Sequence, residues 1–588
     1  MTAATSRWLE RLRAAVVALA DSAAPLAVGA PAVGWVWGAT VLASWATLGR
    51  DQGIFQYIAW AVSQGEVVYR DVRDVNGPVI TMIHWAFLAL GGAEEHRFRV
   101  LDLAVTGGSF AVAGACIPSF VEGRRGPHTT SRLLWALASW AALSAQYVVY
   151  GFWDTAQRES FLDWFVLVSV ALQATRSADG APRDRRTIAA LGVSGALSFL
   201  TWLGKPTYAV FTVAQVLALA LGAPSDVRGA GEHRRRFFSL EHLSPRLRRL
   251  GTFFAGGFVG LVVPVLFIAW RGDLGRWAQI TFVDVPAMYR FIWPRPASVI
   301  LSIPGYDQTA LRALVTTTLL LTAILFGRLP RRTIPVAIMP LMGLLSVVVQ
   351  AKGFPYHFHP VTLGTTFGWL VLIEAVWQSR SPIVRFVALV GAGGVGAHAA
   401  VLAANAPYPE APEVGARDKA SLESAERLDA FTRVDFFPRA LRDAAEYVAA
   451  HTRPTDRVQC YGMDAYVLFL AGRRSATPYI HAYDLNVDAA LHGSFDPEGI
   501  RPSDEERERI RAMREAHAAD LLSRLQRDPP AAFVFVDRSP LMSSPDAEAD
   551  FSSQSPDAGA WLRSHFHQTA EFEGIHVWLP DKATGGPL

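Results

Sequence analysis

Long apolar runs separated by short polar loops fill the first 400 or so residues of the chain. A helix needs about 20 mostly apolar residues to cross the hydrocarbon core of a bilayer. Eleven runs reach or approach this length, so the pattern predicts a polytopic α-helical membrane protein. The predicted spans lie near residues 28–47, 98–119, 133–151, 160–175, 187–204, 206–222, 251–270, 310–327, 333–351, 360–377 and 383–404.

A twelfth apolar segment, residues 78–90, is shorter and contains His84 and Trp85. The charges of the loops decide its status, because short loops rich in Lys and Arg stay in the cytoplasm. If 78–90 does not cross, every basic loop falls on the side of the Arg-bearing N-terminus. We therefore expect an amphipathic or re-entrant helix at the outer interface. The basic loops carry Arg124/Arg125/Arg132, Arg183/Arg185/Arg186, the cluster from Arg228 to Arg249, Arg328/Arg331/Arg332 and Arg380/Arg385.

This topology divides the chain into four parts. Residues 1–27 form a cytoplasmic N-terminus, and residues 28–404 form the membrane domain, with a long first outer loop over 48–97. Residues 405–430 are rich in Ala, Pro and Glu, which is typical of a linker. Residues 431–588 then face outward. We expect a multi-pass protein of the cytoplasmic (inner) membrane.

The C-terminal part has a different pattern, in which helical stretches alternate with short strand-like runs. This alternation predicts a small soluble α/β domain. The helical stretches are Ala440–His451 and Ser503–Leu525, and the strand-like runs are Arg457–Tyr461, Ala531–Val536 and Ile575–Leu579.

Composition agrees with a membrane class, because apolar residues make up 51% and charged residues only 18% of the chain, against about 25% charged in soluble domains. Cys116 and Cys460 lie far apart and indicate no disulfide framework. The first apolar run begins near Leu26 and is long enough to remain as an anchor. We find no Gly-rich phosphate loop and no paired Cys/His zinc spacing, so we expect no cofactor.

The first outer loop carries several short motifs. Asp51-Gln52-Gly53-Ile54-Phe55 follows the first span, Gly65 to Asp71 includes Tyr69-Arg70-Asp71, and Gly77-Pro78 opens the short apolar helix. A long loop with aromatic residues between charges is unusual for a connector. From position alone, Asp51 is equally well explained as a polar stop for the preceding helix.

The order of these motifs, with Arg97 and Arg99 at the start of the next span, resembles the GT-C glycosyltransferases. The nearest groups are the protein O-mannosyltransferases and the bacterial lipid A aminoarabinose transferases. The resemblance covers roughly residues 28–380. It implies that Asp51 lies at the sugar-transfer centre, and it matches a soluble outer domain at the C-terminus.

Chemistry supports this role of Asp51, because inverting transfer from a polyprenyl phosphate needs a base that takes a proton from the acceptor hydroxyl. Many relatives have two adjacent acidic residues here, whereas Gln52 follows Asp51 in this chain, which weakens a protein-mannosyltransferase activity. Asp71 is the second carboxylate candidate. It would orient Arg70 or bind the sugar together with Tyr69 and Arg97; the alternative is a solvated loop carboxylate.

Two more candidates stand at predicted outer ends of spans. Glu159 opens a span, where an ionisable group indicates function by default; an exposed Arg158–Glu159 pair is the alternative. Lys205, in Gly204-Lys205-Pro206, offers a point charge for a lipid phosphate, and GT-C relatives often carry a Lys-Pro here. Its alternative is snorkelling to the headgroups.

The predicted outer loop 352–360 holds Tyr356, His357 and His359. Tyr356 and His357 could donate hydrogen bonds to phosphate oxygens, although aromatic residues also gather at membrane interfaces without a catalytic purpose. The pair His357/His359 is a weak zinc signal. In loop 271–309, Arg290, Trp293 and Arg295 could reach the carrier, but no spacing favours one of them.

The sequence therefore predicts a membrane glycosyltransferase with a polyprenyl-phosphate sugar donor. The acceptor would be a lipid, glycan or protein of the cell envelope. The alternatives are a transporter or flippase of lipid-linked saccharides, and a polymerase or ligase of surface polysaccharide. The Arg234–Arg236 cluster indicates attraction to anionic lipid, and no nucleic-acid partner is expected.

Overall fold

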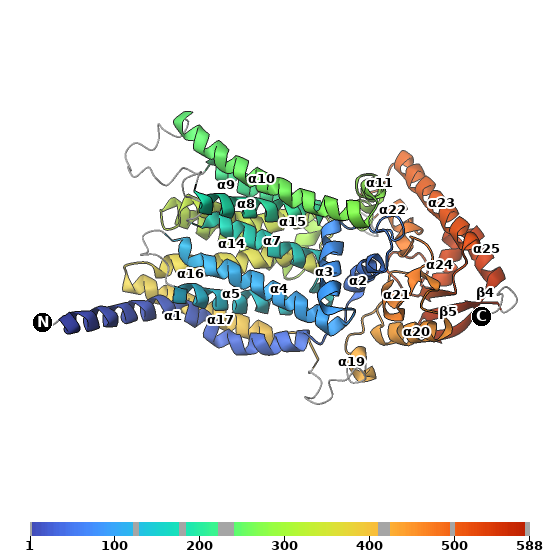
Figure 1. Cartoon of the computed structure of the whole chain (residues 1–588), viewed down its shortest axis with the longest axis horizontal. Helices are drawn as coiled ribbons and strands as arrows, with labels where there is room; N and C mark the ends of the chain where they lie inside the picture. Colours follow the sequence, from blue (N-terminus) through green and yellow to red (C-terminus); the bar gives the residue numbers. More distant parts are fainter. Residues whose placement is uncertain are drawn as a thin grey trace. The chain divides into compact units, whose positions relative to one another are not determined.

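The computed structural model describes residues 3–121, 129–175, 184–221, 240–409, 424–493 and 500–581 (Figure 1). The basic loops around Arg124, Arg183 and Arg228, and most of the predicted linker, lie outside these ranges. Two compact units make up the chain, and each is described by itself. The helical unit comprises Met1–Ser44, Val100–Val263 and Ala297–Tyr408, and the mixed unit comprises Trp45–Arg99, Pro264–Pro296 and Pro409–Leu588.

Antiparallel and parallel α-helices build the helical unit. Short 3-10 turns interrupt them at Thr201–Leu203, Pro206–Tyr208, Arg331–Thr333 and Pro355–Phe358, of which the last three begin at or beside a proline or basic residue. The helices wholly or mostly in this unit are α1 (Ala3–Ala43), α4 (Glu95–Cys116), α5 (Thr129–Val148), α6 (Gly151–Asp154), α7 (Arg158–Ala174), α8 (Arg185–Leu200), α9 (Ala209–Leu221), α10 (Leu240–Arg271), α13 (Ala297–Ser302), α14 (Tyr306–Leu325), α15 (Ile334–Gln350), α16 (His359–Trp377) and α17 (Pro382–Ala404).

Eight helical segments of the described chain are long and apolar enough to cross a membrane, which makes this a multi-pass helical protein. The predicted spans 133–151, 160–175 and 206–222 are also helical, as α5, α7 and α9, but are not among the eight. The total of eleven therefore stays a prediction. The eight segments are Ser22–Ala43, Glu95–Ser119, Arg185–Leu203, Pro245–Arg271, Tyr306–Leu325, Arg331–Gln350, Pro355–Trp377 and Pro382–Ala404.

Small residues let neighbouring helices approach closely. A Cβ atom at Gly256 of α10 would lie 1.9 Å from the Gly192 carbonyl oxygen of α8, and one at Gly260 would lie 2.1 Å from that of Ala196. Residues four apart on each helix thus form one small-residue stripe, as in other membrane helix pairs. Packing of α1 against α5 and α17 likewise relies on alanines, including Ala32, Ala39, Ala141, Ala145 and Ala399.

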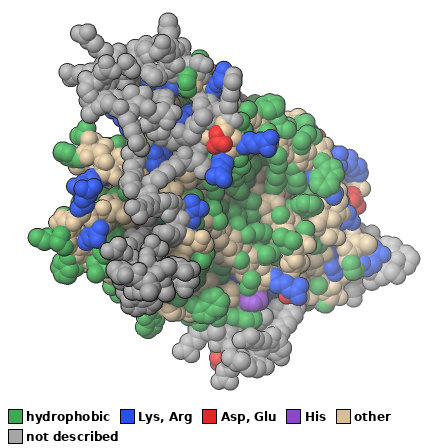
Figure 2. Space-filling view, turned by 60° about the vertical axis from the view of Figure 1, so that its left-hand side comes forward, with side chains coloured by type: hydrophobic (Ala, Val, Ile, Leu, Met, Phe, Trp, Pro, Cys, Tyr) green, Lys and Arg blue, Asp and Glu red, His purple; other side chains and the backbone are tan. Residues whose placement is uncertain are grey.

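Large apolar side chains on these helices are exposed. Leu325 is 82% and Phe258 is 68% accessible. On the face shown in Figure 2, hydrophobic side chains cover much of the described surface, while Lys and Arg gather in smaller groups. Such a surface suits contact with lipid rather than with water.

The mixed unit contains helices and one sheet. Its α3 is 14 residues long, about 21 Å, and so is shorter than the roughly 30 Å hydrocarbon core. The expected short helix at 78–90 is thus present, and its interfacial location stays a prediction. The helices are α2 (Arg50–Ser63), α3 (Pro78–Gly91), α11 (Leu274–Gln279), α12 (Val285–Tyr289), α19 (Ala425–Asp429), α20 (Pro438–His451), α21 (Tyr466–Ala471), α22 (Asp488–Leu491), α23 (Asp504–Arg527), α24 (Ala547–Gln554) and α25 (Pro556–His565).

The sheet has five strands in the order β2-β1-β3-β5-β4. Strands β1, β2 and β3 are parallel, with Val458 opposite Ala532, whereas β5 runs antiparallel to β3 and β4. The predicted α/β character of the C-terminal part is confirmed, and β2, β4, α21, α24 and α25 are additions to it. The strands are β1 (Arg457–Tyr461), β2 (Arg474–Ser475), β3 (Ala532–Val536), β4 (Phe566–Phe572) and β5 (Ile575–Pro580).

The C-terminal α/β part shares its unit with the predicted first outer loop. Ion pairs connect them: Arg50 to Asp464 (3.0 Å), which is buried, and the partly buried pairs of Arg50 with Asp435 (2.8 Å) and of Glu66 with Arg457 (2.7 Å). The tail is therefore one part of a larger compact unit. The predicted borders at residues 27, 404 and 430 themselves stay predictions.

Candidate active site

Three predicted site residues of the helical unit come together: Glu159, Lys205 and His357. Glu159 is the second residue of α7, Lys205 precedes the turn Pro206–Tyr208, and His357 lies in the turn Pro355–Phe358. Gly204 makes the approach to α7 feasible, because a Cβ atom there would lie 2.4 Å from a methyl carbon of Leu162. Each side chain thus lies at the start of a helix, or in or beside a turn that begins with a proline.

Lys205 donates from its ammonium group to Oε1 of Glu159, which is fully buried. Nε2 of His357 lies 3.5 Å from the same oxygen. The Lys205 side chain is itself mostly buried, at 11% accessibility. A buried carboxylate is stable only when a cation or hydrogen-bond donors compensate it, and Lys205 supplies that compensation.

Two polar atoms of this cluster have no hydrogen-bond partner within the described residues. They are Oε2 of Glu159 and Nδ1 of His357, and both are inaccessible to solvent. Buried polar atoms in folded proteins are nearly always hydrogen-bonded. The cluster therefore has unused capacity to accept a hydrogen bond at Glu159 and to bind a ligand atom at His357.

Tyr208 fixes the start of α7 beneath this cluster. Its hydroxyl donates to the Glu159 carbonyl oxygen at 3.1 Å and to Oδ1 of Asp163 at 3.0 Å. Tyr208 and Asp163 are both buried. Because these bonds connect successive turns of α7 with the Lys205 segment, they hold Glu159 and Lys205 in register.

His359 belongs to a separate network and does not join His357 at a common point. Its Nε2 lies 2.8 Å from the Asp154 carbonyl oxygen, and its ring stacks on Tyr150 with centroids 3.9 Å apart. Nearby, the Tyr147 hydroxyl donates to Asp102 at 2.8 Å and accepts from the Ala156 N–H at 2.6 Å. The structure thus does not bring His357 and His359 to a common point, as a zinc site that they share would require. Across the described ranges, no three His, Cys, Asp or Glu side chains are grouped as metal ligands.

Lys352, which the sequence reasoning did not single out, is also buried. It lies between α15 and the turn that carries His357, and burial lowers the pKa of its ammonium group to about 8. A lysine whose pKa is near neutral pH is typical of functional positions. The sequence signal that could have pointed to Lys352 was its position as the first residue of the predicted outer loop 352–360.

Tyr356 and Arg158, both predicted to bind substrate, flank the cluster and are half-buried. The Tyr356 ring lies edge-on to His357, with ring centroids 4.8 Å apart.

Asp51, the predicted catalytic carboxylate, belongs to the mixed unit. It is the second residue of α2 and is half-buried. A carboxylate in the first turn of a helix interacts favourably with the helix dipole.

The neighbours of Asp51 have structural roles. Gln52 is fully buried and its side-chain oxygen accepts the Gly49 N–H, closing the start of α2. A Cβ atom at Gly53 would lie 2.5 Å from the Tyr466 ring, so glycine is needed for α2 to pack on α21. The Asp-x-Gly motif thus combines one accessible carboxylate with two packing residues, and Gln52 does not stand in for a second acid.

The Tyr69-Arg70-Asp71 motif forms a tight turn. Tyr69 has a positive φ of 73°, and its hydroxyl donates to the Asn76 carbonyl oxygen at 3.0 Å. Asp71 accepts from the Val67 N–H at 2.9 Å and pairs with Arg70 at 2.8 Å. Burial opposes ionisation of Asp71, but Arg70 and the Val67 N–H outweigh it and lower its pKa. Asp71 therefore contacts Arg70 directly, and its role in substrate binding stays a prediction.

Arg97 and Arg99 differ in environment. Arg97 is exposed and pairs with Glu94 at 2.8 Å, whereas Arg99 is buried and donates to the Thr47 carbonyl oxygen at 2.7 Å. Arg290 pairs with Glu506 of α23. Each arginine thus has a partner within the protein, and the predicted substrate-binding role of Arg97 stays a prediction.

Arg73 is a further buried cation that sequence reasoning missed. It pairs with Asp284 and with Asp484, both at 2.7 Å, and so connects three distant segments of the mixed unit. It borders a cavity of about 720 Å³ that also involves the predicted residues Tyr69 and Arg70. Arginines outnumber acidic residues in its wall: Arg70, Arg73, Arg276, Arg509 and Arg524 face Asp284 and Asp520. No local sequence signal joins these positions, because they come from four separate segments.

No protein-family model matches the chain, and neither does any curated protein. Among solved structures, ArnT from Cupriavidus metallidurans in the apo state is similar over 100% of both chains, at 13% identity and a TM-score of 0.48. The oligosaccharyltransferase AglB from Archaeoglobus fulgidus, in complex with an inhibitory peptide and a dolichol-phosphate, is similar over 94% of this chain and 74% of its own, at 10% identity and a TM-score of 0.45. At this level of similarity, no residue role passes from these proteins to this chain.

Proposed function

We propose that this protein is a membrane glycosyltransferase that transfers a sugar from a polyprenyl-phosphate donor to an acceptor of the cell envelope. Transfer would take place on the outer face of the cytoplasmic membrane. The observation that carries the proposal is the buried cluster of Glu159, Lys205 and His357, with its unused hydrogen-bonding capacity.

The cluster suits the phosphate of a lipid-linked sugar. Breaking the sugar–phosphate bond leaves negative charge on the phosphate, and a fixed cation stabilises that charge more in a buried site than in water. Lys205 is such a cation, and Glu159 neutralises it while the site is empty. His357 adds an imidazole nitrogen that can donate to a phosphate oxygen.

Asp51 is the proposed general base. An ionised carboxylate would accept the proton of the acceptor hydroxyl as the new glycosidic bond forms and the lipid phosphate leaves. The donor sugar would thereby invert its configuration. The resemblance of its motif to the GT-C glycosyltransferases supports this assignment.

The 720 Å³ cavity of the mixed unit supports an acceptor-binding role for Tyr69 and Arg70. Its wall contains two tyrosines and five arginines, of which Arg70, Arg73 and Arg524 are paired with aspartates. Arginine side chains offer several hydrogen-bond donors to the polar groups of a saccharide.

The decisive experiment is transfer of a radiolabelled sugar from a polyprenyl-phosphate donor by the purified full-length protein. We expect Lys205→Met to lose transfer because the cation is lost, and Glu159→Gln to lose it because the Glu159 carboxylate holds the Lys205 ammonium group in place. The matched control is Glu374→Gln, since Glu374 is equally buried but bonds to Trp135 and Gln378. Equal losses in all three variants would refute a specific phosphate site. Movement of the intact donor across vesicles without transfer would instead support the flippase alternative.

A further inference from the structure

The α/β part of the mixed unit has an edge at which its parallel strands end. These strands stand in the order β2-β1-β3, so β1 has the next strand of the chain on one side and β3 on the other. Open α/β sheets bind ligands outside the carboxyl ends of their strands, at the point where the strand order reverses. Here that point lies between the loop Gly462-Met463-Asp464, which follows β1, and Ser539, which follows β3 and accepts the Met463 N–H at 3.1 Å.

A side chain of the same protein occupies this edge. Arg50, the first residue of α2, donates from Nε to Oδ1 of Asp464 at 3.0 Å and from Nη1 to Oδ2 of Asp435 at 2.8 Å. Arg50 is only 5% and Asp464 only 1% accessible. A guanidinium group presents its donors in a rigid fork and can hold two carboxylates in fixed directions, whereas a lysine ammonium group is a flexible point charge. The usual ligand position of the sheet is thus filled by the start of α2.

The contact continues along one face of α2. Gly53 and Tyr57 follow Arg50 by three and seven positions, which is the spacing of a single helix face. Gly53 allows the helix to lie against the Tyr466 ring. Tyr57 is fully buried, and its hydroxyl oxygen accepts the Ser475 N–H of β2 at 2.7 Å. The first two turns of α2 therefore have a fixed position on the α/β part.

Asp51 lies beside this contact but is not part of it. It follows Arg50 directly, and successive helix residues are about 100° apart around the axis, so its side chain leaves α2 next to the contacting face and is half-buried. Burial raises the pKa of Asp464, the Arg50 guanidinium lowers it, and the negative charges of Asp435 and Asp51 raise it further. The Asp51 carboxylate is thus a near neighbour of the Arg50–Asp464 pair.

The first turn of α2 depends on such an anchor. The helix has 14 residues, and isolated helices shorter than about 12–15 residues are marginal in water. Its N-cap residue is Gly49, which supplies no side-chain hydrogen bond to the helix. The contacts of Arg50 with Asp464 and Asp435 therefore hold the turn that carries Asp51.

We propose that the α/β part positions Asp51 for sugar transfer, and that Asp464 is a positioning residue that acts through Arg50. This inference rests on the proposed function, in which Asp51 takes the proton of the acceptor hydroxyl. A general base must lie within about 2.6–3.2 Å of the heavy atom whose proton it takes, and a displacement of about 1 Å can lower a rate 10²-fold. The place of α2 on the α/β part thus sets the rate of transfer.

Asp464→Ala in the full-length protein tests the proposal, with Glu66→Ala as the matched control. Glu66 also joins the first outer loop to the α/β part, through an ion pair of 2.7 Å with Arg457, but it lies beyond the other end of α2. Both variants lose ion pairing between the same two segments, so a purely structural contact would affect both alike. Asp464→Ala should fold, because Arg50 keeps its pair with Asp435.

We expect Asp464→Ala to lower kcat for sugar transfer by up to about 10²-fold, with an unchanged Kd for the polyprenyl-phosphate donor. Glu66→Ala should retain kcat even where its melting temperature falls equally. Asp464→Asn should regain most of kcat, because its amide oxygen can still accept the hydrogen bond of Arg50. Equal losses of kcat in Asp464→Ala and Glu66→Ala, or no recovery in Asp464→Asn, would overturn the proposal.

Hydrogen–deuterium exchange supplies a readout that is independent of transfer. The backbone amides of residues 50–57 should exchange faster in Asp464→Ala than in Glu66→Ala or the unchanged protein, and unchanged exchange would also overturn the proposal. The two proposals fail in different ways. Full transfer by Asp51→Asn would refute the proposed function and this inference with it, whereas an inactive Asp51→Asn beside a fully active Asp464→Ala would refute the positioning role alone.

Discussion

Lys205 and Glu159 form a buried ion pair although 46 positions separate them in the chain. A proline-started turn carries the ammonium group, and the first turn of α7 carries the carboxylate. Such a pair is costly to bury, and its neighbours leave two polar atoms unsatisfied. A site that keeps an unused acceptor oxygen on Glu159 and an unused ring nitrogen on His357 beside this pair is better suited to binding a ligand than to stabilising the fold.

Substitutions in this pair distinguish its contribution to the stability of the fold from its contribution to donor binding. Lys205→Met leaves the Glu159 carboxylate buried without its cation, and we expect the free energy of unfolding to fall by about 3–5 kcal/mol. The double variant Lys205→Met/Glu159→Gln removes both charges and should regain most of that loss. Thermal unfolding in detergent, followed by tryptophan fluorescence, measures the stability of both variants. Donor binding should stay lost in both variants; its return in the double variant would contradict the role of Lys205.

Asp51→Asn should abolish transfer while the donor still binds. Loss of a general base typically lowers the catalytic rate constant by about 10²–10⁴-fold. The control is Asp273→Asn, because Asp273 caps α11 in the same unit through the Arg276 N–H at 2.9 Å, and asparagine caps equally well. Steady-state transfer and donor-binding measurements on both variants test whether Asp51 acts in catalysis rather than in donor binding. Full transfer by Asp51→Asn would remove Asp51 from the mechanism.

Lys352 should give the protein a pH-dependent stability. Burial lowers the pKa of Lys352 to about 8, from the ordinary value of 10.5. Between these two pH values the unfolded chain binds more protons than the folded one, so stability rises with pH through this window. Below pH 8 the folded protein carries the buried charge. Lys352→Met should therefore have a higher melting temperature than the unchanged protein at pH 7, with a difference that shrinks towards pH 10. A difference that is the same at both pH values would contradict this prediction.

Gly53→Ala should destabilise the mixed unit. The added methyl group would lie 2.5 Å from the Tyr466 ring, and such overpacking costs about 1–3 kcal/mol. Gly275→Ala is the control, because its nearest neighbour would be an Asp273 oxygen at 3.4 Å. Limited proteolysis should cut the Gly53→Ala variant faster within the C-terminal part. Unchanged proteolysis would show that α2 does not depend on its contact with α21.

Reporter fusions test the predicted topology. A fusion after Gly92 should report the outer side and one after Ser379 the cytoplasm, because α3 is too short to cross. An enzyme reporter that is active only outside the membrane, paired with one active only inside, reads both positions. A cytoplasmic Gly92 would place the basic loops outside and refute the topology.

The sequence by itself determined the membrane class, the short helix before Gly92 and the α/β character of the C-terminal part. These follow from local patterns: the length of an apolar run and the alternation of helix and strand periods. It also pointed to Glu159, Lys205 and His357 separately, because a charge at the start of an apolar run is visible locally.

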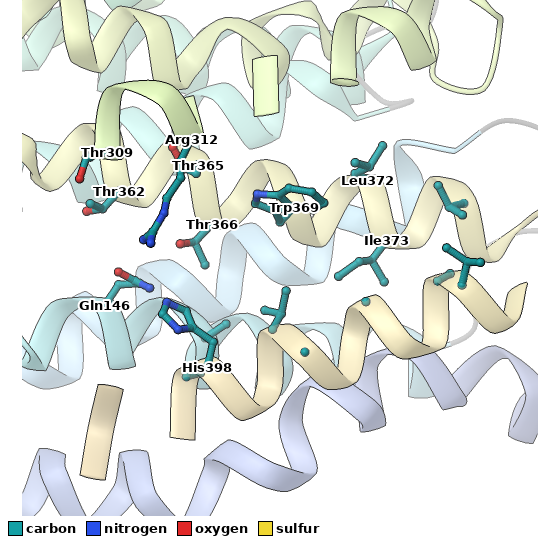
Figure 3. Close-up of a pocket in the computed structure, with 18 residues that line it drawn as sticks. Gln146, Thr309, Arg312, Thr362, Thr365, Thr366, Trp369, Leu372, Ile373 and His398 are labelled. Atoms are coloured by element: carbon teal, nitrogen blue, oxygen red, sulfur yellow. The ribbon is translucent and has the colours of Figure 1, made fainter. Parts of the chain in front are cut away.

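Only the tertiary structure decided which of these groups meet. The pairing of Lys205 with Glu159 and the contacts of Arg73 with Asp284 and Asp484 each depend on contacts between distant segments. So does a cavity of about 610 Å³ in the helical unit (Figure 3), whose wall comes from the four helices α5, α14, α16 and α17. The periodicity of a single helix determines which face is apolar, but the neighbour of that face is set by packing. That is why the sequence could predict the candidate residues and not their partners.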